Sequence, residues 1–236
     1  MSADTSRVPR FLEIADELHR HWAKLAPNTP VESETQLAER FGVNRQTARE
    51  VMKELERRAA VRRIVGRGTF TALKLDYPIE RGRPPSFRRL VAELGREHSI
   101  LSKSVRWRPA RGERPRALIS TRTIAVDGLV AAHATDEIVE HVGEQLHSQI
   151  ADGASIHDAF VSIGLQPWRR RVAVTMGQPP SAIGADLGFV SAAPPSWRVR
   201  SETVDVRSGD TIHRSDTWMR SDVFDVRIEL DLPVER

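Results

Sequence analysis

The sequence predicts an α+β protein with an N-terminal winged helix-turn-helix domain and a C-terminal α+β domain built on an antiparallel sheet. With 236 residues, the chain is long enough for two domains that each bury a core of their own. Residues 31–71 contain two short helical patterns followed by a hairpin pattern with a glycine-flanked tip. From residue 86 onward, strand patterns are interspersed with helical ones, which is typical of an antiparallel sheet with helices.

The charge of the chain is unevenly distributed. Residues 1–75 contain 14 Lys and Arg against 10 Asp and Glu, whereas residues 76–236 contain 22 of each kind. The whole net charge of +4 therefore belongs to the N-terminal segment. An excess of this sign favours a polyanionic partner for that segment, although its small size decides little by itself.

Two absences in the sequence narrow the class of protein. The chain has no cysteine, which excludes disulfides, thiolate metal sites and cysteine nucleophiles. It also has no apolar run with the length of a membrane span or a signal peptide. We therefore expect a cytoplasmic protein with no membrane partner.

A first helix is predicted over residues 9–25. Its apolar stripe consists of Phe11, Ile14, Ala15, Leu18 and Trp22. His19 and His21 lie in the same segment, but no third ligand stands beside them at the spacing that a metal site needs. No metal or cofactor is expected.

The two helices that follow carry their own start and stop signals. Ser33 and Gln36 have the spacing of a capping box at the start of a helix that ends at Phe41. Gly42 allows the positive φ of a tight turn, and Asn44 is placed to cap the next helix. This order of signals predicts a helix-turn-helix.

The second of these helices presents one apolar and one polar face. Apolar residues recur at helical spacing at Ala48, Val51, Met52 and Leu55. The polar face and the N-terminal end carry Arg45, Gln46, Thr47 and Arg49. Arginine pairs with guanine, glutamine with adenine, and threonine contacts a phosphate or a thymine methyl group. These residues predict a recognition helix for the DNA major groove, with a solvated charged face as the alternative for the helix alone.

Residues 61–71 predict a two-stranded wing after that helix. The segment reads VRRIVGRGTFT, with Gly66 and Gly68 on either side of Arg67 at its tip. Glycines at the tip allow Arg67 to approach the DNA backbone or the minor groove closely. A wing in register with the two helices favours DNA binding over a solvated face.

Residues 31–70 resemble the winged-helix domain of the GntR family of bacterial transcriptional regulators. The resemblance rests on SE followed by LA, then F-G-V-x-R-x-T-x-R, V-x-x-L-E and G-R-G-T-F. Two departures bear on local geometry. Glu32 stands where the family usually has proline, and Arg58-Ala59-Ala60 replaces the usual glycine-containing turn before the wing.

The domain boundaries follow from composition. Residues 1–75 form the DNA-binding domain, residues 76–85 a linker rich in proline, glycine and charge, and residues 86–236 the second domain. In that domain, helices are predicted over 87–95, 155–163 and 179–187, and loosely over 135–149. Strands are predicted over 100–107, 117–126, 129–134, 169–176, 197–206, 211–220 and 223–230.

This second domain resembles, more weakly, the UTRA effector-binding domain of the HutC-type branch of GntR regulators. The resemblance rests on R-x-x-x-x-D-G at residues 122–128, G-A-S-I-H at 153–157 and D-x-W-M-R-S-D-x-F at 216–224. Similar domains bind small metabolites, often phosphorylated sugars or related anions, between the sheet and the helices. The resemblance therefore implies a pocket in residues 86–232.

The resemblance also suggests which residues contact the effector. Arg122 stands where the family commonly has an arginine that contacts an anion, and its guanidinium suits phosphate or carboxylate. Ser155 begins a helix, where free N–H groups suit an anion. His157 stands where an aromatic residue often lines the pocket, and Ser86 is placed to close the site from the linker side. The alternative for Arg122 is a structural pair with an acid inside the sheet.

Three departures from the family pattern bear on the ligand. Ile124 stands where a second arginine is frequent, and His133 and His213 replace glutamates that grip sugar hydroxyls in related domains. A site with one arginine, two histidines and serines favours a compact anion, such as phosphate, a phosphonate or a carboxylate, over a polyhydroxylated sugar.

The sequence thus supports a ligand-responsive bacterial transcriptional regulator rather than an enzyme. We expect a repressor that binds a palindromic operator as a homodimer and responds to a small anionic metabolite. One alternative is a regulator that responds to a phosphorylated sugar, and another is a DNA-binding protein whose second domain only dimerises. An enzyme is disfavoured because the sequence has no nucleophile elbow, phosphate loop or metal cluster.

Overall fold

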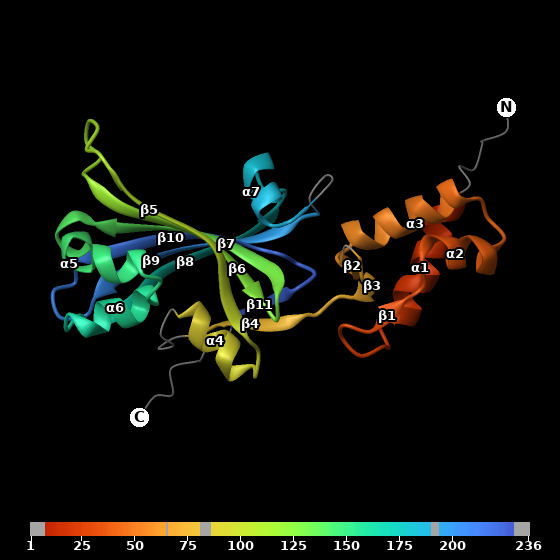
Figure 1. Ribbon diagram of the computed structural model, residues 1–236, viewed down its shortest axis with the longest axis horizontal. Coiled ribbons are helices and arrows are strands. Elements are labelled where there is room, and N and C mark those ends of the chain that lie inside the picture. Colours follow the sequence, from red (N-terminus) through yellow and green to blue (C-terminus); the bar gives the residue numbers. More distant parts are fainter. Residues whose placement is uncertain (1–7, 65, 81–85, 190–193, 229–236) are drawn as a thin grey trace, which may run out of the picture. The chain divides into compact units, whose positions relative to one another are not determined.

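The chain divides into two compact units in the computed structural model (Figure 1). The first unit comprises residues 1–74 together with the short segment 221–223, and the second comprises residues 75–220 and 224–236. The structure describes residues 8–64, 66–80, 86–189 and 194–228. Among these residues, no helix is both long and apolar enough to cross a membrane.

The N-terminal unit is a three-helix domain with a small antiparallel sheet. Its elements are α1 (Arg10–Trp22), β1 (Pro30–Val31), α2 (Glu34–Phe41), α3 (Arg45–Arg57), β2 (Val61–Ile64) and β3 (Gly68–Thr71). The sheet has the order β1-β3-β2, and β2 and β3 form the wing. The helices bury one core, to which Ile14, Leu18, Leu37, Val51 and Leu55 belong. These elements confirm the winged helix-turn-helix prediction.

The caps between the helices have the predicted chemistry. The Ser33 hydroxyl accepts from the backbone N–H of Gln36, and the Gln36 side chain accepts from the backbone N–H of Ser33, which completes the capping box. Gly42 has a φ of 61°. The Asn44 side chain accepts from the backbone N–H of Thr47 at 2.8 Å. The start of α3 is therefore capped by a residue next to it in the sequence.

The two departures from the family pattern have local consequences. Glu32 forms an ion pair with Arg40 of α2. Ala59 takes a φ of 52°, a left-handed conformation that costs a residue with a Cβ free energy and that glycine adopts freely. The chain therefore makes the turn before the wing without a glycine and carries backbone strain at Ala59.

The second unit is built on a six-stranded antiparallel sheet with the order β5-β6-β7-β10-β9-β8. Its strands are β4 (Leu75–Ile79), β5 (His98–Arg108), β6 (Ala117–Val126), β7 (Leu129–Val139), β8 (Pro167–Gly177), β9 (Ser196–Asp205), β10 (Thr211–Met219) and β11 (Phe224–Ile228). Its helices are α4 (Phe87–Glu93), α5 (Glu140–Ala151), α6 (Ile156–Ser162) and α7 (Ser181–Asp186). The α+β class and the antiparallel sheet are thus confirmed.

One face of the sheet carries the main core of this unit. Helix α5 packs on β5, β6 and β7, and α6 packs on α5 and β8 (Figure 1). The buried cluster between them includes Leu118, Ile138, Leu146 and Phe160. In each strand, every second side chain points to this face. Polar residues at those positions therefore face the space beside the helices.

Two sequence predictions in this region are wrong. The first residues of the predicted linker 76–85 belong to strand β4, which pairs in parallel with β11, and residues 81–85 lie outside the described residues. The segment 135–139, predicted as loosely helical, continues strand β7. One of the buried positions of this segment is Asp136, a charged residue that can be buried because it is paired. Asp136 interrupts the alternation of apolar residues that would have predicted a strand.

Candidate functional site

The outward face of α3 carries the side chains predicted to contact DNA. Arg45, Gln46 and Arg49 are exposed, and Thr47 is half-buried, with its N–H bound to the Asn44 cap. The opposite face of α3 is in the core of the domain. Because the two faces are separated in this way, a ligand can contact the polar face without disturbing the packing of the helix.

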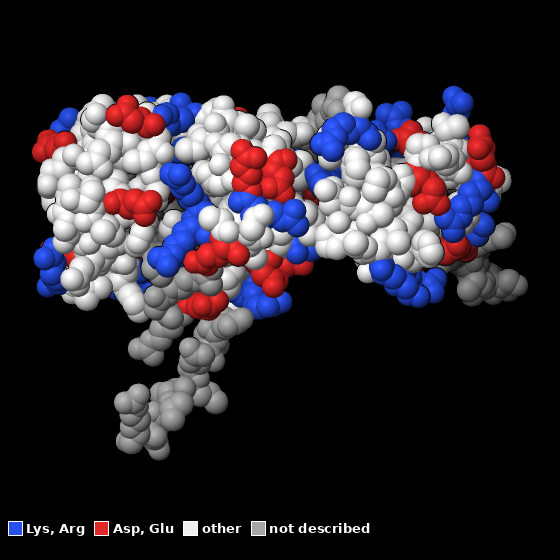
Figure 2. Space-filling view, turned by 60° about the horizontal axis from the view of Figure 1, so that its bottom comes forward, with Lys and Arg blue, Asp and Glu red and all other residues white. Residues whose placement is uncertain are grey.

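Basic and acidic side chains are intermixed on the face of the N-terminal unit shown in Figure 2. Five of its arginines pair with carboxylates: Arg10, Arg40, Arg57, Arg58 and Arg63. Within the described part of the chain, neither an ion pair nor a hydrogen bond is found for Arg45 or Arg49. Their charges therefore remain available to an external anion.

The wing tip presents a third arginine. Gly66 and Gly68 have φ values of 74° and 108°, and among the described residues no atom beyond the two chain neighbours lies within 4 Å of a Cβ added to either glycine. Glycine is thus needed there for backbone conformation rather than for space. The Arg67 guanidinium lies 5.8 Å from the centre of the Phe70 ring and is exposed. Val65 lies outside the described residues.

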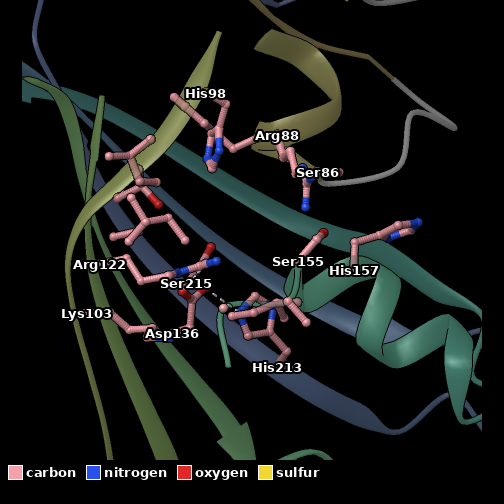
Figure 3. Close-up of a pocket in the computed structure, with 18 of the residues that line it drawn as sticks. Ser86, Arg88, His98, Lys103, Arg122, Asp136, Ser155, His157, His213 and Ser215 are labelled. Carbon is pink, nitrogen blue, oxygen red and sulfur yellow. Dashed lines mark hydrogen bonds and ion pairs between the residues drawn. The ribbon is translucent and has the colours of Figure 1, made fainter. Parts of the chain in front are cut away.

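A cavity of about 610 Å³ opens beside α4 and α6 on the inner face of the large sheet (Figure 3). Five of the six residues predicted to contact an effector line it: Ser86, Arg122, Ser155, His157 and His213. They come from four parts of the sequence and meet because β6 and β10 both flank β7. Ile124 also lines the cavity.

His133 is not one of the lining residues, and the expectation that it contacts the effector is wrong. It pairs in register with Thr123 and Trp218, and its Nδ1 lies 3.3 Å from Asp186 of α7. Ala134, the next residue along β7, lines the cavity. Since successive side chains of a strand point to opposite faces, His133 lies on the far side of the sheet.

A buried carboxylate joins two of the predicted residues. Asp136, which is 4% exposed, accepts hydrogen bonds from Arg122 Nη2 at 2.7 Å and from His213 Nε2 at 2.8 Å. Burial alone would raise the pKa of Asp136, but the charge of Arg122 and the bond from His213 outweigh it and lower this pKa below its ordinary value. Arg122 is therefore both a structural partner and a pocket residue.

Sequence reasoning missed Asp136. The sequence allows the alternative that Arg122 pairs with an acid, but nothing in a single sequence identifies that acid across the sheet. A periodic strand pattern through residue 139 would have placed Asp136 on the same face as Ala134 and Ile138, and so toward the cavity.

The cavity carries more positive than negative side chains. Its charged lining consists of Arg88, Lys103, Arg122 and Arg169 against Asp136 and Asp152. The Nε atoms of Arg122 and Arg169 are buried and have no partner within the described residues. Burial lowers the pKa of His98 and of His157. Burial thus favours the neutral form of both imidazoles, and the arginine and lysine side chains of the lining supply positive charge.

The two serines predicted at the site serve as helix caps. Ser86 Oγ accepts from the N–H of Arg89 at 3.3 Å, and Ser155 Oγ accepts from the N–H of Asp158 at 3.4 Å. Each hydroxyl keeps its own hydrogen as a donor. Figure 3 shows Arg122 and Asp136 close together, with Ser86 and Arg88 on another side of the pocket. A ligand that contacts both sides must be larger than a single small ion.

Comparison with known proteins relates the N-terminal unit to a family. Residues 11–71 match the family described as bacterial regulatory proteins, gntR family. The chain is 33% identical to the HTH-type transcriptional repressor NagR of Bacillus subtilis over 69 residues. This aligned segment covers 28% of each protein. It is 28% identical to an HTH-type transcriptional regulator of Rhizobium meliloti over 209 residues. That alignment covers 84% of this chain and 85% of the relative.

Solved structures resemble the chain over nearly its whole length. PhnF from Mycobacterium smegmatis has a TM-score of 0.59 and 21% identity, over 92% of this chain and 99% of PhnF. A possible transcriptional regulator from Bacillus subtilis, YydK, has a TM-score of 0.52 and 15% identity, over 95% of this chain and 100% of that chain. At these identities, the likeness shows the fold.

Proposed function

We propose, from the premise that the N-terminal unit is a GntR-family helix-turn-helix domain, that the chain is a transcriptional repressor controlled by a small anionic metabolite. The observation that carries the DNA-binding part is a set of arginines on α3 and at the wing tip for which the described residues supply no carboxylate partner. Arg45, Arg49 and Arg67 remain exposed on a unit where five other arginines are paired with acids. Phosphate oxygens and guanine edges are the partners that suit such groups.

The regulator is proposed to act as a homodimer on a palindromic operator. One recognition helix contacts few base pairs, so a single domain has little power to select a site in a genome. A two-fold dimer doubles the number of base pairs read and places its half-sites at a fixed spacing. Sedimentation of the full chain alone and with operator DNA tests this part, because a monomer bound to a single half-site would contradict it.

The effector is proposed to be an anion that binds in the cavity of the second unit. The excess of positive side chains supports this chemistry, as do the buried Nε atoms of Arg122 and Arg169, for which the described residues supply no acceptor. Because Asp136 already neutralises part of the charge of Arg122, the anion needs further contacts from Arg88, Lys103 or the serine hydroxyls.

The size of the cavity favours a second candidate class, the phosphorylated sugars. A volume of about 610 Å³ lies in the range of pockets that enclose whole metabolites, so a lone phosphate ion would leave most of it to water. A sugar phosphate would place its anion at the arginines and its hydroxyls at the serine and threonine side chains of the lining. A carboxylate or phosphonate with a polar body of similar length would fit by the same argument.

Calorimetric titration of the full chain separates these ligand classes. Phosphate, a short phosphonate, a dicarboxylate and a sugar phosphate are compared with the corresponding neutral sugar. The proposal expects saturable heat with at least one anion and its loss in Arg122→Ala. Tight binding of the neutral sugar without binding of any anion would contradict the anionic effector. Silence with all ligands, with DNA binding intact, would favour a second domain that only dimerises.

A further inference from the structure

An acidic side chain stands in the middle of the proposed DNA-reading face of α3. Gln46 lies three and four residues before Arg49 and Glu50, and Lys53 lies four and three residues after them, so all four share one face of the helix. The core residues Ala48, Val51, Met52 and Leu55 lie on the opposite side of the helix. Glu50 therefore faces the same way as the residues proposed to contact DNA. A carboxylate in this place repels the phosphate backbone, so its presence calls for a role that offsets this cost.

The hydrogen bonds of Glu50 indicate what this role is. Its Oε1 accepts from the Gln46 side-chain amide, Nε2, at 3.0 Å and from Lys53 Nζ at 3.0 Å. Its side chain is 38% exposed, so its second oxygen and its partners remain near solvent. A carboxylate that pairs with a lysine accepts hydrogen bonds and does not donate them.

This acceptor fixes the orientation of the Gln46 amide. Only the NH₂ group of Gln46 can donate to Glu50, so the amide oxygen Oε1 must point away from it. One N–H of the NH₂ group remains free beside that oxygen. A free N–H next to a free oxygen is the pair of groups that recognises adenine, through N7 and the N6 amine in the major groove.

We propose that Glu50 is a positioning residue that selects adenine through Gln46. It holds the Gln46 amide in one orientation before DNA binds, so less conformational freedom is lost when the base is contacted. This inference rests on the proposed DNA-binding function, and it adds a specificity-determining residue that does not itself contact the base. Lys53 balances the charge of Glu50 and limits its repulsion of the DNA backbone.

A direct role for Glu50 makes a different prediction. A glutamate that reads DNA itself accepts from the N4 amine of cytosine. Gln46 and Glu50 are four residues apart, so one helical turn separates their Cα atoms along the axis of α3. A direct contact by Glu50 would consequently affect a different base pair from the one that Gln46 reads.

Selection of binding sites from a random DNA library tests the inference without a known operator or effector. The full-length chain is compared with Gln46→Ala, Glu50→Ala, Glu50→Gln and Lys53→Ala. Glu50→Gln keeps an oxygen that can accept from Gln46, and Lys53→Ala removes the other partner of Glu50 while leaving the Gln46 contact. Circular dichroism of each variant establishes that the helices are formed.

The expected result is a loss of adenine preference at the same base pair in Gln46→Ala and Glu50→Ala. The loss in Glu50→Ala should be about threefold to tenfold, the cost of restoring freedom to one side chain. Glu50→Gln should retain the preference, and Lys53→Ala should weaken binding to all sequences alike. This change at one base pair is one that a merely structural role of Glu50 would not produce.

Three results would overturn the inference. One is an unchanged base preference in Glu50→Ala, and another is a change confined to a base pair that Gln46→Ala does not affect. A wild-type pool without any consensus would overturn the proposed DNA-binding function, and the inference with it. The first two results leave that function intact, so the two failures can be told apart.

Discussion

The arginines of the two proposed sites lie in opposite environments. On α3 and the wing, Arg45, Arg49 and Arg67 are exposed, and no carboxylate among the described residues pairs with them. In the cavity of the second unit, Arg122 is largely buried and bonded to Asp136. A surface arginine keeps its hydration until DNA replaces it, whereas a buried one needs a permanent counter-charge to offset its desolvation. The first arrangement suits a long polyanion, and the second suits one small ligand of defined shape.

The largest expected effect comes from removing the counter-charge in the second unit. Asp136→Ala leaves Arg122 and His213 buried without their shared acceptor, so we expect a loss of about 3–5 kcal/mol in the unfolding free energy of that unit. The matched control is Asp216→Ala, which breaks the more exposed pair with Arg198 on the same sheet and should cost about 0–1 kcal/mol. Chemical denaturation of the full chain measures both values, and equal losses would contradict the comparison.

Removal of an exposed arginine should affect DNA binding rather than stability. Arg49→Ala is expected to weaken DNA binding by about 1–3 kcal/mol if it contacts a guanine, or to lower the salt slope by about 1 if it contacts a phosphate. Fluorescence anisotropy at several salt concentrations separates the two cases. Arg10→Ala is the control, because Arg10 is paired with Glu13 on α1. An equal effect of the two substitutions would contradict the assignment of the α3 face.

Acid should destabilise both units through paired glutamates. The hydrogen bond from Arg57, together with that from Arg58, lowers the pKa of Glu54 to about 2, against the opposing effect of burial. A similar pair of bonds from Arg108 and then Arg114 lowers the pKa of Glu137 to about 2.

The sign of the effect follows from the depressed pKa values. A carboxylate with a folded pKa below its ordinary value contributes stability that is fully present above about pH 4.5 and is lost as the pH falls toward 2. Glu54→Gln should therefore destabilise the chain at pH 7 and have a smaller effect near pH 2.5, as measured by chemical denaturation. An equal loss at both pH values would show that Glu54 contributes through packing rather than charge.

The smallest expected effect is a gain in stability at the turn before the wing. Ala59→Gly relieves a left-handed conformation that costs about 1–2 kcal/mol, less the entropy that glycine adds to the unfolded chain. A net gain of about 0.5–1 kcal/mol is expected in urea unfolding. Ala60→Gly is the control and should destabilise, because Ala60 is partly buried and its φ is not positive. A loss of stability in Ala59→Gly would mean that its buried methyl group outweighs the strain.

The comparison also explains how much the sequence could predict. The helix-turn-helix depends on neighbours in the chain, so the Ser33 capping box, the Gly42 turn and the Asn44 cap could be predicted and are confirmed. The pocket depends on residues distant in sequence. Asp136 and His213 meet across two strands, and neither a composition nor a spacing rule reveals that register.

Errors in the second unit have the same physical origin. His133 was expected in the pocket because its residue type fitted, but the alternation of β7 turns it to the opposite face. The residues of β4 read as a linker because they contain Pro78 and charges. A proline is tolerated in β4 because that strand has a single partner, β11, among the described strands.

In the proposed regulation, an anion bound in the second unit changes the affinity of the first unit for DNA. The most direct test is an anisotropy titration with DNA from upstream of the gene and its neighbours, repeated with phosphate, phosphonates, dicarboxylates and sugar phosphates. We expect one anion to shift the DNA affinity saturably, the shift to disappear in Arg122→Ala, and DNA to change the affinity for the anion by the same factor. Specific DNA binding that none of these anions alters, or that a neutral sugar alone alters, would contradict it.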